Sequence, residues 1–92
     1  MYSVILSHRA SKDLTGIVEY IAEANPDAAE RIGFELVNFA MSLDSMPYRG
    51  SKVKKRRGVL KLVHGDYLIY YRVNKGKKTV EVLSFQHGAR VK

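Results

Sequence analysis

The sequence predicts an α+β domain in the order β-α-α-β-β-β, with a helical hairpin packed on one face of a mainly antiparallel four-stranded sheet. Apolar residues recur at helical spacing over residues 8–24 and 26–43, and short apolar runs occupy residues 2–6 and 59–86. Tight-turn residues separate the later runs. The 92 residues, 46% apolar and 27% charged, suit one globular domain spanning residues 1–92.

The first half of the chain is predicted to hold one strand and two helices. Apolar side chains alternate over residues 2–6, and Ser7 suits the N-cap of a helix that follows. Asn25-Pro26-Asp27 ends that helix near Ala24 and starts another, because proline blocks continuation but fits a first turn, and Asn25 suits the N-cap of this second helix. The second helix is apolar on two sides, so we expect it between the first helix and the sheet. One stripe is Ile32, Leu36, Phe39, Ala40 and Leu43, and the other is Phe34, Val37 and Met41.

The second half is predicted to be a basic loop followed by three strands. Residues 50–58 form the loop, bounded by glycines. Two residues, Gly65-Asp66, separate the apolar runs 59–64 and 67–73, which is typical of a tight hairpin. A second turn over residues 74–77 leads to the last run, residues 78–86. Strict alternation there places Val80, Val82 and Ser84 on one face and Thr79, Glu81, Leu83 and Phe85 on the other.

Composition excludes several classes of function. The chain has no cysteine, which excludes disulfides, thiolate metal sites and cysteine nucleophiles. Its three histidines lack the paired spacing of metal ligands. No apolar run approaches the ~20 residues of a membrane span, and the first residues lack the basic segment of a signal peptide. We therefore expect a cytoplasmic protein without metal, small-molecule cofactor or membrane association.

Charge is distributed unevenly along the chain. Residues 1–48 hold three basic and seven acidic side chains, a net charge of −4, whereas residues 49–92 hold thirteen basic and two acidic ones, a net charge of +11. Such a field attracts polyanions, either nucleic acid or an acidic protein segment. Seven cations fall within thirteen residues: Arg49, Lys52, Lys54, Lys55, Arg56, Arg57 and Lys61.

Four motifs in order carry a family resemblance. They are Asp13-Leu14-x-x-Ile17-x-x-Tyr20-Ile21-Ala22, then Asn25-Pro26-Asp27-Ala28-Ala29, then Tyr67-Leu68-Ile69-Tyr70-Tyr71-Arg72-Val73 with Val82-Leu83, and finally His87-Gly88-Ala89-Arg90. Over nearly its whole length the chain resembles the ParE/RelE superfamily of bacterial type II toxin–antitoxin toxins, in particular the ParE-like (plasmid stabilisation) branch. The resemblance implies the same β-α-α-β-β-β fold.

The resemblance implies different targets for its two branches. RelE-type toxins are ribosome-dependent endoribonucleases that cut mRNA, whereas ParE-type toxins interfere with DNA gyrase and stabilise its broken-DNA intermediate without chemistry of their own. Both are neutralised by a cognate antitoxin that wraps the toxin. The expected partners are thus an acidic antitoxin and DNA gyrase or, alternatively, the ribosome and mRNA. A non-toxic nucleic-acid-binding module of the same fold is a third possibility.

A catalytic role depends on few residues. Cleavage through a 2′-hydroxyl needs an acid or base beside cations that stabilise charge on phosphorus. If the chain is a ribonuclease, His87 is the candidate acid or base, with Arg72 and Arg90 as cations. RelE-type enzymes often carry a C-terminal tyrosine, but no tyrosine follows Tyr71 here, which favours binding over catalysis. His87 could instead be structural.

Arg72 is a charged residue within an apolar strand, so it either lines a pocket or pairs with a carboxylate such as Glu81.

The basic run is interpreted as a binding surface for target or antitoxin. The candidate binding residues are Arg49, Lys52, Lys54, Lys55, Arg56, Arg57, Lys61, Arg72, His87 and Arg90.

Overall fold

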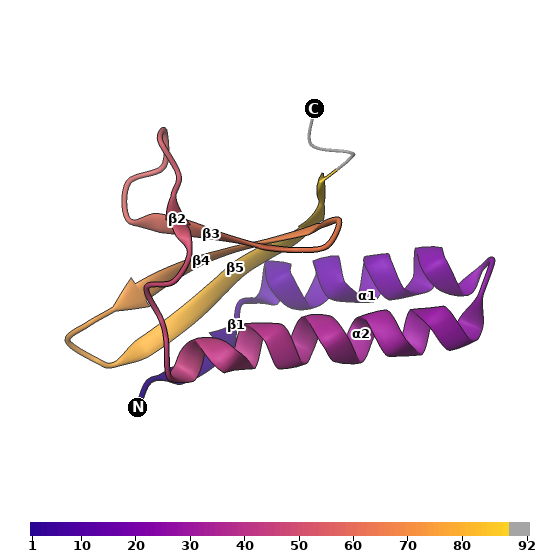
Figure 1. Ribbon diagram of the computed structural model, residues 1–92, viewed down its shortest axis with the longest axis horizontal. Helices are drawn as coiled ribbons and strands as arrows, with labels where there is room; N and C mark the ends of the chain where they lie inside the picture. The colour runs from indigo at the N-terminus through magenta and orange to yellow at the C-terminus, as the bar shows by residue number, and fades with distance from the viewer. Residues whose placement is uncertain (89–92) are drawn as a thin grey trace.

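The computed structural model describes residues 1–88 and has two helices on one face of a twisted sheet (Figure 1). The α+β prediction is therefore confirmed. In chain order the elements are β1 Ser3–Leu6, α1 His8–Ala22, α2 Pro26–Met41, the short 3-10 helix η1 Ser42–Asp44, β2 Ser51–Lys52, β3 Val59–His64, β4 Tyr67–Asn74 and β5 Thr79–His87.

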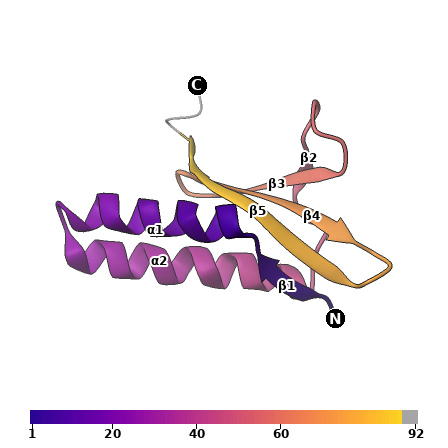
Figure 2. The same ribbon diagram turned by 180° about the vertical axis from the view of Figure 1, so that it is seen from behind.

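The sheet has five strands in the order β1-β5-β4-β3-β2, so the prediction of four strands was wrong. The additional strand is β2, which lies within the predicted basic loop and pairs antiparallel with β3 through Ser51 opposite Lys61 and Lys52 opposite Leu60. Two exposed residues give no periodicity that a sequence pattern could detect. Figure 2 shows β1 beside β5 at the other edge, where the pairing is parallel.

Both helices begin at the predicted caps. The Ser7 hydroxyl oxygen accepts a hydrogen bond from the Ala10 N–H at 3.0 Å, and the Asn25 side-chain oxygen accepts one from the Ala28 N–H at 3.0 Å. Pro26 occupies the first turn of α2, where no intrahelical donor is lost. The two caps therefore fix the first residue of each helix and the position of the turn between them.

A β-bulge in β5 changes which side chains face the helices. The register against β4 shifts between Tyr70 and Tyr71, which leaves Leu83 as an extra residue. Phe85 therefore returns to the same face as Val82, and both are buried. The prediction that Phe85 faces away from the other core residues of this strand was wrong, because strict alternation takes no account of a bulge.

Side chains at the start of α1 satisfy backbone groups near the bulge. The Ser7 hydroxyl donates to the Leu83 carbonyl at 3.1 Å, and the Phe85 N–H donates to an Asp13 carboxylate oxygen at 3.2 Å. Ser7 is therefore both the cap of α1 and a link from α1 to β5. These contacts position the first helix on the sheet.

The core lies between the helical hairpin and the sheet. Its largest fully buried side chains are Tyr71, Leu36, Leu43, Ile69, Val80 and Val82. Only one of the two apolar stripes of α2 contributes to it. In the other stripe Phe34 is 63% exposed and Met41 is 46% exposed. The prediction that both stripes are covered was therefore wrong.

Candidate functional site

A groove with both apolar and cationic lining lies where the β2–β3 connection folds against the sheet. Its volume is about 720 Å³. We define the cationic groove by two sets of lining residues: the cations Lys52, Lys54, Arg56 and Arg57, and the apolar side chains Val53, Val59, Leu60, Val73 and Tyr48. No carboxylate lines it among the described residues 1–88. The groove therefore suits an anionic partner that also presents an apolar group.

The cations of the groove are carried on a hydrogen-bonded turn. The Val53 N–H donates to the Val59 carbonyl at 3.0 Å, and the Val59 N–H donates to the Arg56 carbonyl at 3.1 Å. Gly58 has a φ of +76°, a left-handed conformation that glycine adopts without steric cost. The basic segment is therefore a folded connection between β2 and β3.

A buried tyrosine anchors the start of this segment. The Gly50 N–H donates to the hydroxyl of Tyr71 at 2.9 Å, and Tyr71 is fully buried. A Cβ atom on Gly50 would lie 2.6 Å from that hydroxyl and 2.7 Å from the Lys61 carbonyl oxygen, so only glycine fits. Burial raises the pKa of Tyr71 above its ordinary 10.0, while the Gly50 hydrogen bond and the charge of Arg49 oppose the rise.

Two further side chains extend the positive charge beside the groove. The Arg56 guanidinium lies over the Tyr70 ring, 5.6 Å from its centroid, which is a cation–π contact. Arg72 lies on the same sheet face as Tyr70, and its Nε is 4.0 Å from the position that a Cβ of Gly58 would take. Glu81 is directly opposite Arg72 in the sheet, and both are exposed. Arg72 thus adjoins the groove beside a carboxylate.

The remaining cations of the basic run lie apart from the groove lining. Lys55 is exposed in the same turn, and Lys61 is half-buried on β3. The Arg49 guanidinium lies 4.7 Å from the Phe39 ring centroid and donates to the Ser42 hydroxyl at 2.7 Å. Arg49 therefore holds the chain against the end of α2.

His87 is far from this cationic surface. It pairs in the sheet with Tyr67, whose side chain shares the helix-facing side with Tyr71, whereas Arg72 faces the other side. Tyr67 and Arg72 are also five residues apart along β4, roughly 17 Å at the usual rise per residue. The structure therefore brings Arg72 close to Arg56 but separates His87 from both. Arg90 lies outside the described residues.

A second cavity contains His87. It has a volume of about 590 Å³ and lies between α1 and the sheet, with Asp13 and Tyr67 in its lining. The His87 and Tyr67 rings meet edge to face with centroids 5.1 Å apart. His87 therefore packs against an aromatic ring in a cavity distinct from the cationic groove.

Two classes of site have no counterpart in the described residues. Across residues 1–88, no three potential ligand side chains lie together in a way that could hold a metal ion. None of the helices in that same part of the chain is long and apolar enough to cross a bilayer.

Sequence reasoning missed the apolar half of the groove and its anchor. Val53 is a single apolar residue between two lysines, and Val73 is the last residue of a predicted strand, so the sequence does not indicate that both line one groove. Tyr71 offered one signal, because a tyrosine in a buried strand needs a hydrogen-bond partner. The sequence does not indicate that this partner is Gly50.

Comparisons with known proteins agree with this architecture. Residues 4–92 match the family described as ParE toxin of type II toxin–antitoxin system, parDE. Toxin RelE2 of Caulobacter vibrioides is 35% identical over 91 residues, covering 99% of this chain and 100% of that protein.

Solved structures share the fold. The chromosomal ParDE TA system from P. aeruginosa includes a chain that matches with a TM-score of 0.82 at 20% identity, covering 95% of this chain and 96% of that one. A chain of the toxin–antitoxin complex RelBE2 from Mycobacterium tuberculosis matches with a TM-score of 0.70 at 28% identity, covering 94% and 96%. The family resemblance is confirmed: the chain belongs to the ParE toxin family of type II toxin–antitoxin systems, within the ParE/RelE superfamily.

Proposed function

We propose that this toxin acts in the cytoplasm by binding DNA gyrase, without chemistry of its own. The observation that carries the proposal is the separation of His87 from the four cations of the cationic groove, since Lys12 is the one cation among the described residues that lines the His87 cavity. Ribonucleolytic cleavage requires an acid or base within hydrogen-bond reach of the reacting group, next to the cations that hold the phosphate. His87 lies on the opposite sheet face from Arg72 and lines a different cavity from Arg56.

A gyrase cleavage assay tests this proposal. Purified toxin is incubated with gyrase and supercoiled plasmid, and the broken-DNA intermediate is trapped with detergent and protease. We expect linear DNA to accumulate with toxin concentration. Substitution of His87 by alanine is expected to leave this accumulation unchanged, because a binding mechanism needs no proton transfer at that position. Growth arrest on induction without any rise in cleaved DNA would rule the proposal out.

The second candidate is a RelE-like ribosome-dependent endoribonuclease. Two observations favour it: the relative from Caulobacter vibrioides is named Toxin RelE2, and the cationic groove suits phosphates. In that case the toxin cleaves mRNA in a cell-free translation extract, and His87→Ala lowers cleavage by about 10² or more, the usual contribution of a general acid or base. Intact translation in the extract together with undiminished toxicity of His87→Ala would exclude this candidate.

We also propose that an acidic, partly helical segment of a cognate antitoxin binds the cationic groove. Among residues 1–88 the groove has four cations and no carboxylate in its lining, so carboxylates of a partner gain favourable charge contacts there. Its valine and leucine side chains offer apolar contact to the same segment. A segment of this kind is expected to order when it binds.

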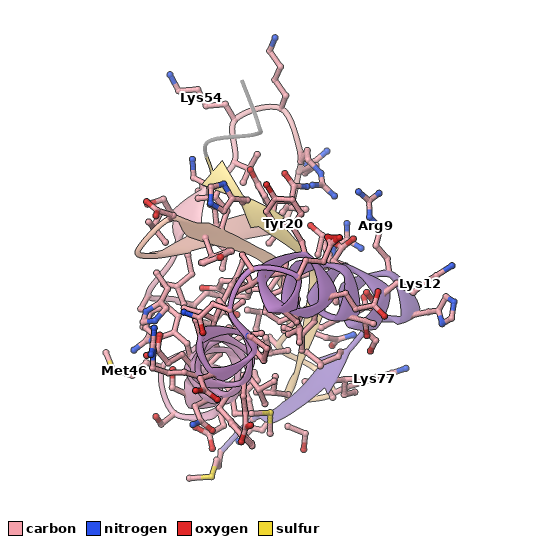
Figure 3. The ribbon with its side chains drawn as sticks, turned by 90° about the vertical axis from the view of Figure 1, so that its right-hand side faces the viewer. Arg9, Lys12, Tyr20, Met46, Lys54 and Lys77 are labelled. Carbon is pink, nitrogen blue, oxygen red and sulfur yellow. The ribbon has the colours of Figure 1, made fainter. Side chains whose placement is uncertain are left out.

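Charge reversal at two sites tests this placement. Arg56→Glu with Arg57→Glu changes the groove, whereas Lys75→Glu with Lys77→Glu changes the β4–β5 turn by the same charge. Figure 3 shows Lys54, on the groove segment, and Lys77 projecting from well-separated parts of the surface.

The binding partner in this test is the product of the neighbouring reading frame, measured by calorimetry. We expect the groove variant to weaken binding at least tenfold and the turn variant to change it less than threefold. Equal losses at both sites would contradict the placement.

A further inference from the structure

An apolar surface on the helical hairpin is left uncovered. Phe34 is 63% exposed, and Val37 and Met41 follow it on the same side of α2. Single exposed apolar residues are ordinary, but a contiguous group next to a hollow indicates an interaction surface. Within the described residues, α1 and α2 pack on the sheet through other side chains, so this surface is available to a partner.

The surface contains a shallow hollow along the seam between the helices. Its volume is about 240 Å³, which is roughly the space of eight water molecules and enough for an aromatic ring. Gly33 is part of its lining and allows the two helices to approach closely, since a Cβ there would lie 3.1 Å from a Val18 methyl carbon. We define the hairpin face as the apolar lining of this hollow: Leu14, Val18, Ala29, Gly33, Phe34 and Val37.

We propose that a second copy of this chain covers the hairpin face, in a dimer with two-fold symmetry. Phe34 projects from the rim of the hollow rather than filling it. Under a two-fold axis, one protomer's Phe34 enters the partner's hollow and the partner's Phe34 enters the first. Protrusion and hollow lie side by side on one surface, which is the arrangement that an isologous interface requires.

Charges around Phe34 favour a second copy over an acidic or nucleic-acid partner. Asp27, Glu30 and Arg31 surround Phe34 in a neighbouring depression, so the rim carries both signs. Carboxylates at the rim repel a polyanion, whereas a second copy brings its own Arg31 to meet them. The charged side chains in the described lining of the cationic groove are all positive, so the acidic segment proposed for the groove and the second copy use different surfaces.

The size of the hairpin face indicates a weak dimer. A 16-residue helix is about 24 Å long, and two adjacent helices are roughly 20 Å wide, so the whole outer side of the helical hairpin, which includes the hairpin face, limits the interface to on the order of 500 Å² per chain. Specific interfaces bury about 800 Å² per partner, so this one lies at the low end. Figure 3, which looks along the helices, shows Lys54 of the groove segment projecting at the top of the view, away from both helices. A dimer through the hairpin therefore leaves the cationic groove accessible.

Sedimentation velocity of the purified chain tests the proposal. Protein concentrations of about 1–200 μM bracket a dissociation constant on the order of 10 μM. We expect the sedimentation coefficient to rise with concentration from monomer to dimer. Phe34→Ser is expected to weaken dimerisation at least tenfold. The matched control is Val63→Ser, which removes an apolar side chain of similar exposure, 57%, from the sheet face remote from the helices. A chain that stays monomeric at 200 μM, or equal losses in both variants, would overturn the proposal.

A charge exchange gives a second measurement that does not depend on the phenylalanine. Arg31→Glu makes the rim wholly acidic, and Glu30→Arg reverses the other sign. Each variant alone is expected to dimerise at least fivefold more weakly, because like charges meet across the axis, and an equimolar mixture is expected to recover dimer. A mixture that stays as monomeric as either variant would refute the two-fold pairing. So would a loss of antitoxin binding in Phe34→Ser with self-association unchanged, since the antitoxin would then be the occupant.

Discussion

Substitution of Gly50 by alanine is expected to lower the denaturant concentration at the midpoint of unfolding. The decrease should be larger than for alanine at any other glycine except Gly58 and Gly65, which have positive φ. Gly50 lies against the buried Tyr71 hydroxyl and the Lys61 carbonyl. The added methyl group would lie 2.6 Å and 2.7 Å from these two oxygens, and the second belongs to the backbone of β3. Relief of the contact therefore requires movement of the strand or of residue 50 itself.

The magnitude follows from three contributions. Overpacking of a buried site costs about 1–3 kcal/mol. Movement of Gly50 also breaks its hydrogen bond to Tyr71 and leaves a buried hydroxyl without that donor, which costs about 1–3 kcal/mol. Alanine lowers the entropy of the unfolded chain and returns about 0.4–1 kcal/mol. We therefore expect the free energy of unfolding to fall by about 3 kcal/mol, the middle of the range of about 1–6 kcal/mol that these contributions span, which is a large share of the 5–15 kcal/mol typical of a domain.

Urea unfolding followed by circular dichroism measures this difference. The control is Gly76→Ala in the β4–β5 turn, where the new Cβ would lie 3.6 Å from the Asn74 side-chain oxygen, an ordinary contact. That variant is expected to stay within about 0.5 kcal/mol of the native chain. Indistinguishable midpoints for Gly50→Ala and Gly76→Ala, with equal slopes, would refute the role assigned to Gly50 as the fixed start of the basic segment.

Three further predictions concern stability. Tyr71→Phe is expected to lower the free energy of unfolding by about 1–2 kcal/mol at pH 8, because the Gly50 N–H loses its acceptor. This deficit should shrink above pH 10. Burial raises the pKa of Tyr71 in the folded state, so the phenol ionises first in the unfolded chain, and this lowers the stability of the unsubstituted protein but not that of Tyr71→Phe. Urea titrations of both proteins at pH 8 and 10.5 measure the change. Asn25→Ala should cost about 1 kcal/mol through loss of the α2 cap. Gly16→Ala, in α1 with open space around it, should raise the thermal midpoint, because alanine gains about 0.5–1 kcal/mol over glycine in a helix.

Much of the fold could be predicted because its signals are local. Ser7 and Asn25 cap the helices as their chemistry indicates, and Gly65-Asp66 forms the hairpin turn between β3 and β4. The errors arose where a contact with another strand or with a residue distant in the sequence decides the outcome. Strand β2 exists only because β3 is there to pair with it, and the bulge at Leu83 is stabilised by Ser7 of another element.

The candidate site was predicted in part. Sequence reasoning identified Arg56 and Arg57 from their charge, and the structure brings them together at one groove. Charge alone could not separate them from Arg49, whose guanidinium packs on Phe39 instead. The distance between His87 and Arg72 depends on which face of the sheet each side chain takes, and residues in different strands have no fixed relation in the sequence.

The parallel pairing of β1 with β5 has a consequence for synthesis. The residues that meet there are 76 positions apart in the chain, as in the bond between Ser7 and Leu83. A nascent chain that ends before Thr79 has no strand with which β1 can pair. Its helical hairpin also lacks β5, the longest strand of the sheet on which it packs. Such long-range contacts delay folding. The first strand therefore stays unpaired until residues 79–82 have emerged from the ribosome, so the two edges of this domain are completed at very different times during synthesis.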